Sequence, residues 1–112
     1  MRVTSELFVK ALCRTARGQG AFAYVAHKGA ESAGAIFVAT DNMQGGMSLY
    51  GPAIQMMLED DGERRFECVI ENGTRAEIET KIASELKFDQ DLWLVEIEDR
   101  DARPFVELVS DT

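Results

Sequence analysis

The strongest structural signal in the chain is carried by residues 74–98, TRAEIETKIASELKFDQDLWLVEIE. Thr74 and Glu77 have the spacing of a capping box, so a helix is predicted to begin here and to end near Lys87. Its apolar stripe consists of Ile78, Ile82, Ala83 and Leu86. After a polar turn, apolar and mostly polar residues alternate through residues 92–98, which is typical of a strand with one apolar face. That face would be formed by Trp93, Val95 and Ile97.

The first half of the chain predicts a helix followed by strands. Thr4 is a good N-cap, and Gly18 can end the helix in the left-handed conformation. The expected stripe consists of Leu7, Phe8, Ala11, Leu12 and Thr15. Residues 21–27 and 35–40 are rich in β-branched and aromatic side chains and flank a polar loop, so we expect two adjacent antiparallel strands.

A third strand is predicted from Met47, with a bend at Gly51-Pro52 and a continuation to Glu59. Asp61-Gly62 is typical of a tight hairpin turn leading into a fourth strand over residues 64–71. A short helix through Phe66, Val69 and Ile70 is the alternative, because short apolar runs fit both periodicities.

These elements predict an α+β fold with the order α-β-β-β-β-α-β. We expect a twisted, mostly antiparallel sheet of about five strands with two helices on one face. The strand-helix-strand unit at the end predicts that the last strand runs parallel to the one before the second helix. Residues 1–103 would form a single domain, and residues 104–112 a tail that is either an edge extension of the sheet or disordered.

Charge and composition exclude several classes of function. The chain has 112 residues, a net charge of -8 and 12 basic residues spread along its length, which argues against nucleic acid and anionic membranes as partners. It lacks the apolar run of about seven residues needed for a secretory signal, and the ~20 of a membrane span. Cys13 and Cys68, with His27 as the only histidine, do not have zinc-site spacing, and we expect both to be small buried hydrophobic side chains. We therefore expect a cytoplasmic protein with reduced thiols and neither metal nor cofactor.

Four segments of the chain resemble a known family: SELFV at 5–9, AGAIFV at 33–38, LYGP at 49–52 and above all FDQDLWLVEIEDR at 88–100. They are similar to an uncharacterised bacterial family known only as domain of unknown function fourteen ninety-one. The resemblance runs from about residue 3 to residue 100. It implies a small stand-alone cytoplasmic protein, and it brings no assigned activity, cofactor or catalytic residue.

Two constellations are candidates for chemistry. Glu96 and Glu98 share a strand face, so they suit a divalent cation or acid catalysis, unless they are solvated or paired with Arg100 or Lys81. His27 can serve as a base beside an anion-binding lysine, although a histidine at a strand end is more often a hydrogen-bonded surface residue.

The sequence does not bring a nucleophile, a base and an oxyanion donor together, which favours a non-enzymatic interaction or accessory module. The alternative is a small-molecule-binding protein or minor enzyme with a pocket between sheet and helices. Its polar lining would be drawn from Arg14, His27, Arg65 and Glu96.

Four of the five methionines lie between residues 43 and 57, namely Met43, Met47, Met56 and Met57. Methionine adapts to irregular apolar surfaces, and Pro52 favours a position at the edge of a sheet. The region therefore predicts self-association or binding of a protein partner. The alternative is that these methionines fill gaps in the core.

Overall fold

The described residues, 3–54 and 64–109, fold in the predicted order of helix, four strands, helix and strand. The structure is a computed structural model. The elements are α1 (Ser5–Gly18), β1 (Phe22–His27), β2 (Ile36–Asp41), β3 (Met47–Pro52), β4 (Phe66–Gly73), α2 (Arg75–Leu86) and β5 (Trp93–Glu98). Both predicted N-caps are present: Thr4 accepts a hydrogen bond from the Leu7 amide, and Thr74 and Glu77 form the full capping box.

The five strands form one mostly antiparallel sheet in the order β1-β5-β2-β3-β4. The predicted α+β class is confirmed, but the predicted pairing of β1 with β2 is wrong, because β5 lies between them. β5 is antiparallel to β1 and parallel to β2. It also runs in the same direction as β4, as the strand-helix-strand unit predicted, but two strands separate the pair.

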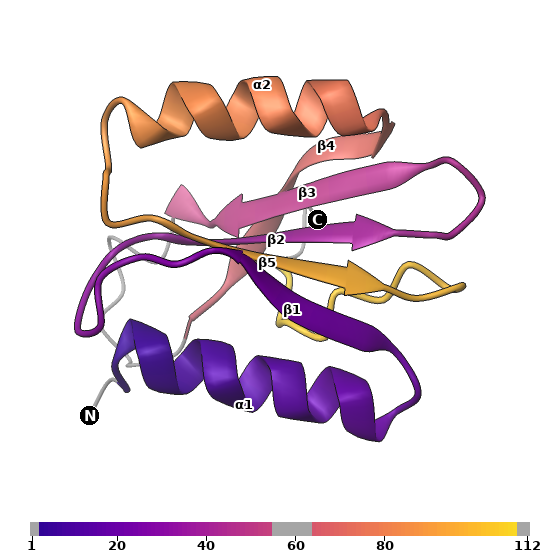
Figure 1. Ribbon diagram of the computed structural model, residues 1–112, viewed down its shortest axis with the longest axis horizontal. Helices are drawn as coiled ribbons and strands as arrows, with labels where there is room; N and C mark the ends of the chain where they lie inside the picture. The colour runs from indigo at the N-terminus through magenta and orange to yellow at the C-terminus, as the bar shows by residue number, and fades with distance from the viewer. Residues whose placement is uncertain (1–2, 55–63, 110–112) are drawn as a thin grey trace.

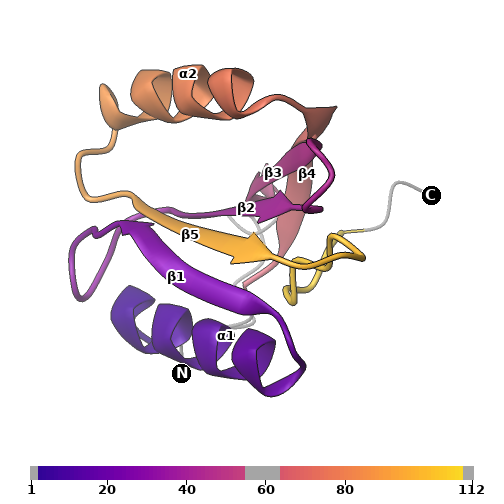
Figure 2. The ribbon, with the colours of Figure 1, turned by 45° about the vertical axis from the view of Figure 1, so that its right-hand side comes forward.

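The two helices cover opposite faces of the sheet, so the prediction of both helices on one face is wrong. Figure 1 and Figure 2 show α2 on one side of the strands and α1 on the other. In β2, Ile36 and Val38 belong to the core cluster beneath α1, whereas Phe37 and Ala39 belong to the cluster beneath α2. The apolar run of β2 is continuous because both of its faces are buried.

The buried face of α1 is rotated relative to the predicted stripe. Leu7 is 58% exposed, whereas Val9 and Ala16 are buried against the sheet. Of the predicted stripe, only Leu12 is fully buried, and Cys13 lies beside it in the core as expected. The small side chains on this face let the helix pack closely against the sheet, and their low hydrophobicity concealed the stripe in the sequence.

The region from β3 to β4 corrects three further expectations. β3 lies inside the sheet and Pro52 pairs with Phe66, so the prediction that Pro52 marks an edge strand is wrong. Residues 66–73 form a strand, so the helical alternative is wrong too. Cys68, expected to be buried, is exposed. The predicted continuation of the third strand beyond residue 54 and the Asp61-Gly62 hairpin lie outside the described residues.

The described part of the expected tail follows the edge-extension alternative. The Phe66 amide donates to the Glu107 carbonyl at 2.8 Å, and the Val109 amide donates to the Phe66 carbonyl at 2.9 Å. Phe105 packs against the core on the α1 face, and the Arg103 guanidinium lies 4.8 Å from the centre of its ring. This segment covers part of the outer edge of β4. Among the described residues, neither helix is long and apolar enough to cross a membrane.

Candidate functional site

The edge strand β1 is the most exposed apolar element of the sheet. Among the described residues, it pairs with β5 on one side and with no strand on the other. Its sequence, FAYVAH, has no acidic residue, lysine, arginine or proline, and Phe22, Tyr24 and Val25 are 66%, 41% and 41% exposed. A long uncharged edge strand is a template for pairing with another chain, and proteins normally block it with lysine or proline.

Arg17 at the end of α1 reaches over to this edge and occupies one of its carbonyl groups. Its Nε and Nη2 atoms donate to the Ala23 carbonyl oxygen at 3.1 and 2.6 Å. Because the Ala23 carbonyl is bound by a side chain outside the sheet, it points away from β5. The backbone groups of every second residue of a strand point to the same side. Ala23 and Val25 therefore present their backbone groups at the free edge. The Ala21 amide, two residues earlier, is bound by the Ala16 carbonyl at 3.0 Å.

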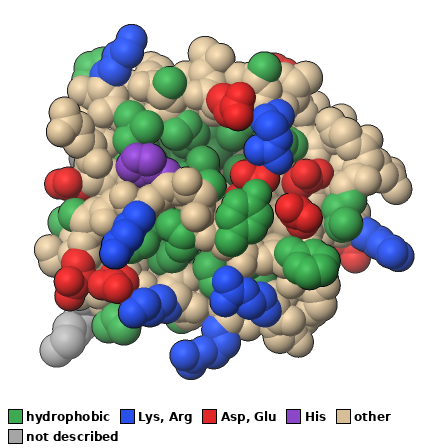
Figure 3. All heavy atoms as spheres, viewed as in Figure 1, with side chains coloured by type: hydrophobic (Ala, Val, Ile, Leu, Met, Phe, Trp, Pro, Cys, Tyr) green, Lys and Arg blue, Asp and Glu red, His purple; other side chains and the backbone are tan. Residues whose placement is uncertain are grey.

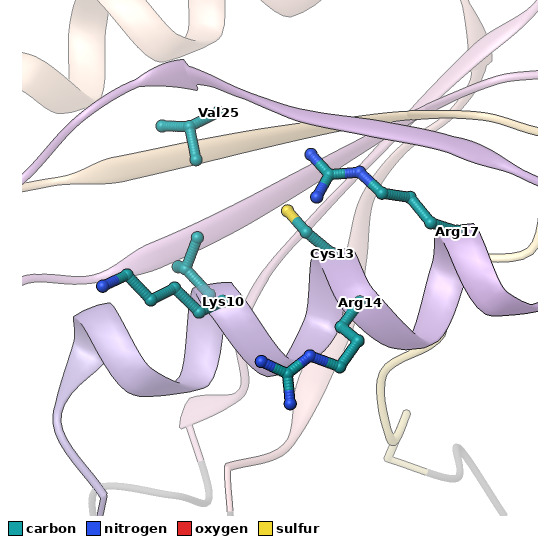
Figure 4. A pocket seen from close by; sticks show the side chains of 6 residues that line it. Lys10, Cys13, Arg14, Arg17 and Val25 are labelled. Carbon is teal, nitrogen blue, oxygen red and sulfur yellow. The ribbon is translucent and has the colours of Figure 1, made fainter.

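A groove runs between this edge and α1. It consists of two adjoining cavities of about 320 and 400 Å³ that share the side chains of Val9, Lys10 and Val25. The remaining lining residues are Cys13, Arg14 and Arg17 in the first cavity and Glu6, Lys28 and Trp93 in the second. Figure 4 shows the Cys13 thiol and the Arg17 guanidinium turned toward β1, while the Arg14 side chain extends away from the strand.

The groove is cationic in an acidic protein. Four basic residues line it, Lys10, Arg14, Arg17 and Lys28, against the single acidic residue Glu6. Lys10 and Glu6 form an ion pair at 3.2 Å. Figure 3 shows several Lys and Arg side chains in the lower part of the view, where α1 lies in Figure 1. Because the whole chain carries a net charge of -8, this local excess of positive charge favours an anionic ligand here.

A second polar cluster lies on the α2 face of the sheet and holds the buried carboxylate of Glu96. Arg75, the first residue of α2, donates to both oxygens of Glu96, at 2.6 Å from Nη2 and 3.3 Å from Nη1. Its Nη2 also lies 3.9 Å from Asp41 of β2. Tyr24 of β1 donates its hydroxyl to the same carboxylate. The cluster therefore ties three strands to the beginning of α2.

The pKa shifts in this cluster follow from its hydrogen bonds and its burial. Burial raises the pKa of Glu96, but hydrogen bonds from Arg75 and Tyr24 and the Arg75 charge lower it by more, so it lies below its usual range. Burial, the hydrogen bond to Glu96 and the nearby carboxylate charges raise the pKa of Tyr24 to about 12. At neutral pH Glu96 is thus a carboxylate and Tyr24 a neutral hydroxyl, which are the states in which Tyr24 donates and Glu96 accepts the hydrogen bond between them.

The remaining predicted site residues do not converge. His27 contacts the Leu92 carbonyl through Nδ1 at 3.0 Å, which joins the ends of β1 and β5. Glu98 lies on the same strand face as Glu96, and the ion pair of Arg75 is with Glu96. Arg100 and Lys81 were the predicted salt-bridge partners of Glu96 and Glu98. The ion pair of Glu96 is instead formed by Arg75, and Lys81 pairs with Glu85.

Arg65 lies on the other side of the molecule, 3.8 Å from Glu107 of the C-terminal segment. Of Arg14, His27, Arg65 and Glu96, the candidates for the lining of a pocket between sheet and helices, only Arg14 lines the groove along α1. Within the described part of the chain there is also no group of three or more His, Cys, Asp or Glu side chains that could hold a metal ion.

The methionine region does not form one surface. Met47 is only 4% exposed and belongs to the core beneath α2, so its proposed role in an interface is wrong. Met43 is 52% exposed in the turn between β2 and β3, and Met56 and Met57 lie outside the described residues. Cys13 is likewise a core residue: burial raises the pKa of its thiol although Arg17 lowers it.

Fold and site together define a small α+β domain with an open edge strand beside a cationic groove. The chain belongs to the protein family of unknown function DUF1491, whose model matches residues 3–107. The resemblance read from the sequence is therefore confirmed. No curated protein matches the chain.

Solved structures that are similar to this chain have the same fold. Protein Atu0922 from A. tumefaciens is 43% identical, with a TM-score of 0.88, and the alignment covers 100% of this chain and 98% of that one. A DUF1491 family protein from Caulobacter crescentus, solved by crystallography, is 32% identical with a TM-score of 0.81 over 98% and 100% of the two chains. An NMR structure of a family protein from the same organism is 35% identical, with a TM-score of 0.80 over 98% and 99%.

Proposed function

We propose that this protein is a non-enzymatic interaction module that binds an extended segment of a partner protein along β1. The observation that carries the proposal is the free edge of β1, with its uncharged sequence and exposed Phe22, Tyr24 and Val25. An extended peptide can add to such an edge as a further strand, since backbone hydrogen bonds supply affinity and alternate side chains supply specificity.

The other edge of the sheet is less suited to this role. At β4, the segment 107–109 already bonds to both backbone groups of Phe66. The strand also carries Glu67 and Glu71, and charged residues on an edge oppose strand addition. Within the part of the chain that the structure describes, the edge of β1 is covered by the Arg17 side chain and by the Ala21 bond to α1. The asymmetry supports β1 as the binding edge.

The test is a selection of peptides from a random displayed library against the folded protein, followed by binding to two variants. Val25→Pro removes the amide hydrogen that Val25 presents at the free edge, and proline is tolerated where that group faces solvent. Val25→Thr is the matched control, because it keeps the amide and a β-branched side chain of similar shape. Far-UV circular dichroism checks that both variants remain folded.

We expect selected peptides to lose at least about tenfold in affinity for Val25→Pro, as strand addition depends on consecutive backbone bonds, and to bind Val25→Thr nearly as well as the natural protein. Peptides that bind Val25→Pro undiminished would place the interaction elsewhere. A library that yields no binder sensitive to this substitution would likewise contradict the proposal.

A further inference from the structure

We infer that the partner segment is acidic, and that one of its carboxylates takes over the Arg17 guanidinium and thereby frees the Ala23 carbonyl for the added strand. The inference rests on the proposed function and adds the chemistry of the partner. It starts from one observation. Within the described residues, the Ala23 carbonyl is the one backbone carbonyl at the free edge that accepts a side-chain hydrogen bond, and the donor is an arginine.

The Arg17 contact is suited to such an exchange. Two guanidinium donors converge on one neutral oxygen of Ala23, at 3.1 and 2.6 Å. A carboxylate offers two charged oxygens in the geometry that an arginine fork matches, so each donor would gain an acceptor of its own and a charge-assisted bond. The released Ala23 carbonyl can then accept an amide of the incoming strand. An edge that is blocked in the free protein becomes available when the correct partner arrives.

The other cations of the groove extend this recognition along β1. Arg17 binds at Ala23, near the beginning of the strand, and Lys28 follows directly after its last residue. A strand rises about 3.3 Å per residue, so the two cations bracket a partner segment of about six residues. Lys10 and Arg14 lie on α1 between these ends of the groove. Lys10 is shared with Glu6, which a partner carboxylate would have to displace.

The alternation of side chains specifies a sequence pattern. Side chains of the added strand that point toward α1 enter the groove, where Val9, Cys13 and Val25 provide an apolar floor and the cations lie around it. Side chains that point to the other face lie beside Phe22 and Tyr24, which are exposed. The preferred partner therefore alternates acidic residues on the α1 side with apolar or aromatic residues on the other.

Charge argues against a second copy of this chain as the occupant. Pairing β1 with β1 would bring a strand without any acidic residue to the groove. It would also bring the cations of the second α1 close to those of the first, and like charges disfavour the contact. An acidic segment of a different protein fits both the edge and its charge.

The experiment uses two hexapeptides with blocked ends, Glu-Val-Glu-Phe-Glu-Val and its neutral counterpart Gln-Val-Gln-Phe-Gln-Val. Each is titrated into the full chain while the backbone amides of Ala23 and Val25 and the Nε–H of Arg17 are followed by NMR. We expect the acidic peptide to bind several-fold more tightly and to shift all three signals. We also expect its affinity to fall between about 0.05 and 0.5 M salt, where screening shortens the range of the charges.

Variants on the two faces test where the charge acts. The double variant Lys10→Gln, Lys28→Gln removes two groove cations whose side chains are exposed, so the fold should tolerate it. It should weaken binding of the acidic peptide about 2- to 30-fold, if each lost pair has the usual strength of an exposed ion pair. The control Lys81→Gln, Lys87→Gln makes the same change in net charge around α2, on the opposite face, and should leave the affinity unchanged.

The outcomes separate the two proposals. Equal binding of both peptides at the β1 amides overturns the acidic specificity but supports strand addition. Equal weakening by the groove and control variants also overturns the specificity, because net charge alone would explain it. An acidic peptide that binds without shifting the β1 amides, or fails to bind at about 1 mM, overturns the inference. An unchanged Arg17 Nε–H signal in the bound state overturns the exchange at Ala23.

Discussion

Replacing Arg75 by methionine should destabilise the protein by about 2–3 kcal/mol at pH 7. The Glu96 side chain is 5% exposed and receives two hydrogen bonds from Arg75, so the variant leaves a buried carboxylate with Tyr24 as its remaining side-chain donor. A hydrogen bond to a charged group contributes about 1.5–3 kcal/mol to the free energy of unfolding. The contribution of the two bonds together is smaller than their sum, because half of the Arg75 side chain is exposed to water. The melting temperature should fall by roughly 10 °C for a chain of this length.

The cost should depend on pH with a defined sign. In the natural protein the pKa of Glu96 lies below its usual value, so its stabilising effect is complete above the unfolded pKa and is lost as pH falls through the folded one. Without Arg75, burial raises this pKa, and protonation then relieves the unpaired charge. Arg75→Met should therefore cost more at pH 7 than at pH 4.

Urea unfolding followed by far-UV circular dichroism at both pH values measures the effect. In the double variant Arg75→Met, Glu96→Gln the loss should be smaller than the sum of the single losses, since both charged partners are removed together. Arg100→Met is the matched control, because it removes an exposed arginine near the end of β5. A cost below about 0.5 kcal/mol, or one that is equal at the two pH values, would refute the structural role assigned to the pair.

Two further substitutions test the core and the cap. Trp93→Ala should cost about 3–5 kcal/mol, because the ring is 3% exposed and its Nε1 donates to the Ala30 carbonyl at 2.8 Å; a near-neutral urea midpoint would contradict the packing against α1. Thr74→Ala should cost about 1 kcal/mol by loss of the capping bond to the Glu77 amide. The same variant should bind peptides at β1 with unchanged affinity, measured by the same titration, and a loss of affinity at constant stability would show that α2 takes part in recognition.

The features that were predicted correctly from the sequence are those that depend on residues close together in the chain. The Thr74 capping box needs only residues three positions apart, and it is present as predicted. The strand at 93–98 was recognisable by alternation, and its apolar side lies beneath α1. Helix α1 was predicted from its caps, but its buried face was missed because Cys13 and Ala16 contribute little hydrophobicity.

Strand order is decided by contacts between distant parts of the chain, and here prediction failed. Adjacent strands along the chain usually pair, yet β5 inserts between β1 and β2. One signal was available: the continuous apolar run of β2 is typical of a strand buried on both faces, which requires a helix on each side. The groove beside β1 could not be predicted without this strand order, because the order is what makes β1 an edge strand. Arg14 was named as a candidate, whereas Arg17 gains its role only because β1 is an edge.

Two features of β1 limit unspecific pairing of its open edge with other chains and still allow a partner to bind. Proline or inward charges would block pairing permanently, and β1 has neither. Its protections are an irregularity in register between Val25 and His27 and the side chain of Arg17 on the Ala23 carbonyl. The Arg17 contact is a pair of hydrogen bonds made by an exposed side chain, so it can be exchanged at small cost for a carboxylate. A neutral strand offers Arg17 no such replacement, and the same side chain that admits an acidic partner therefore opposes an uncharged one.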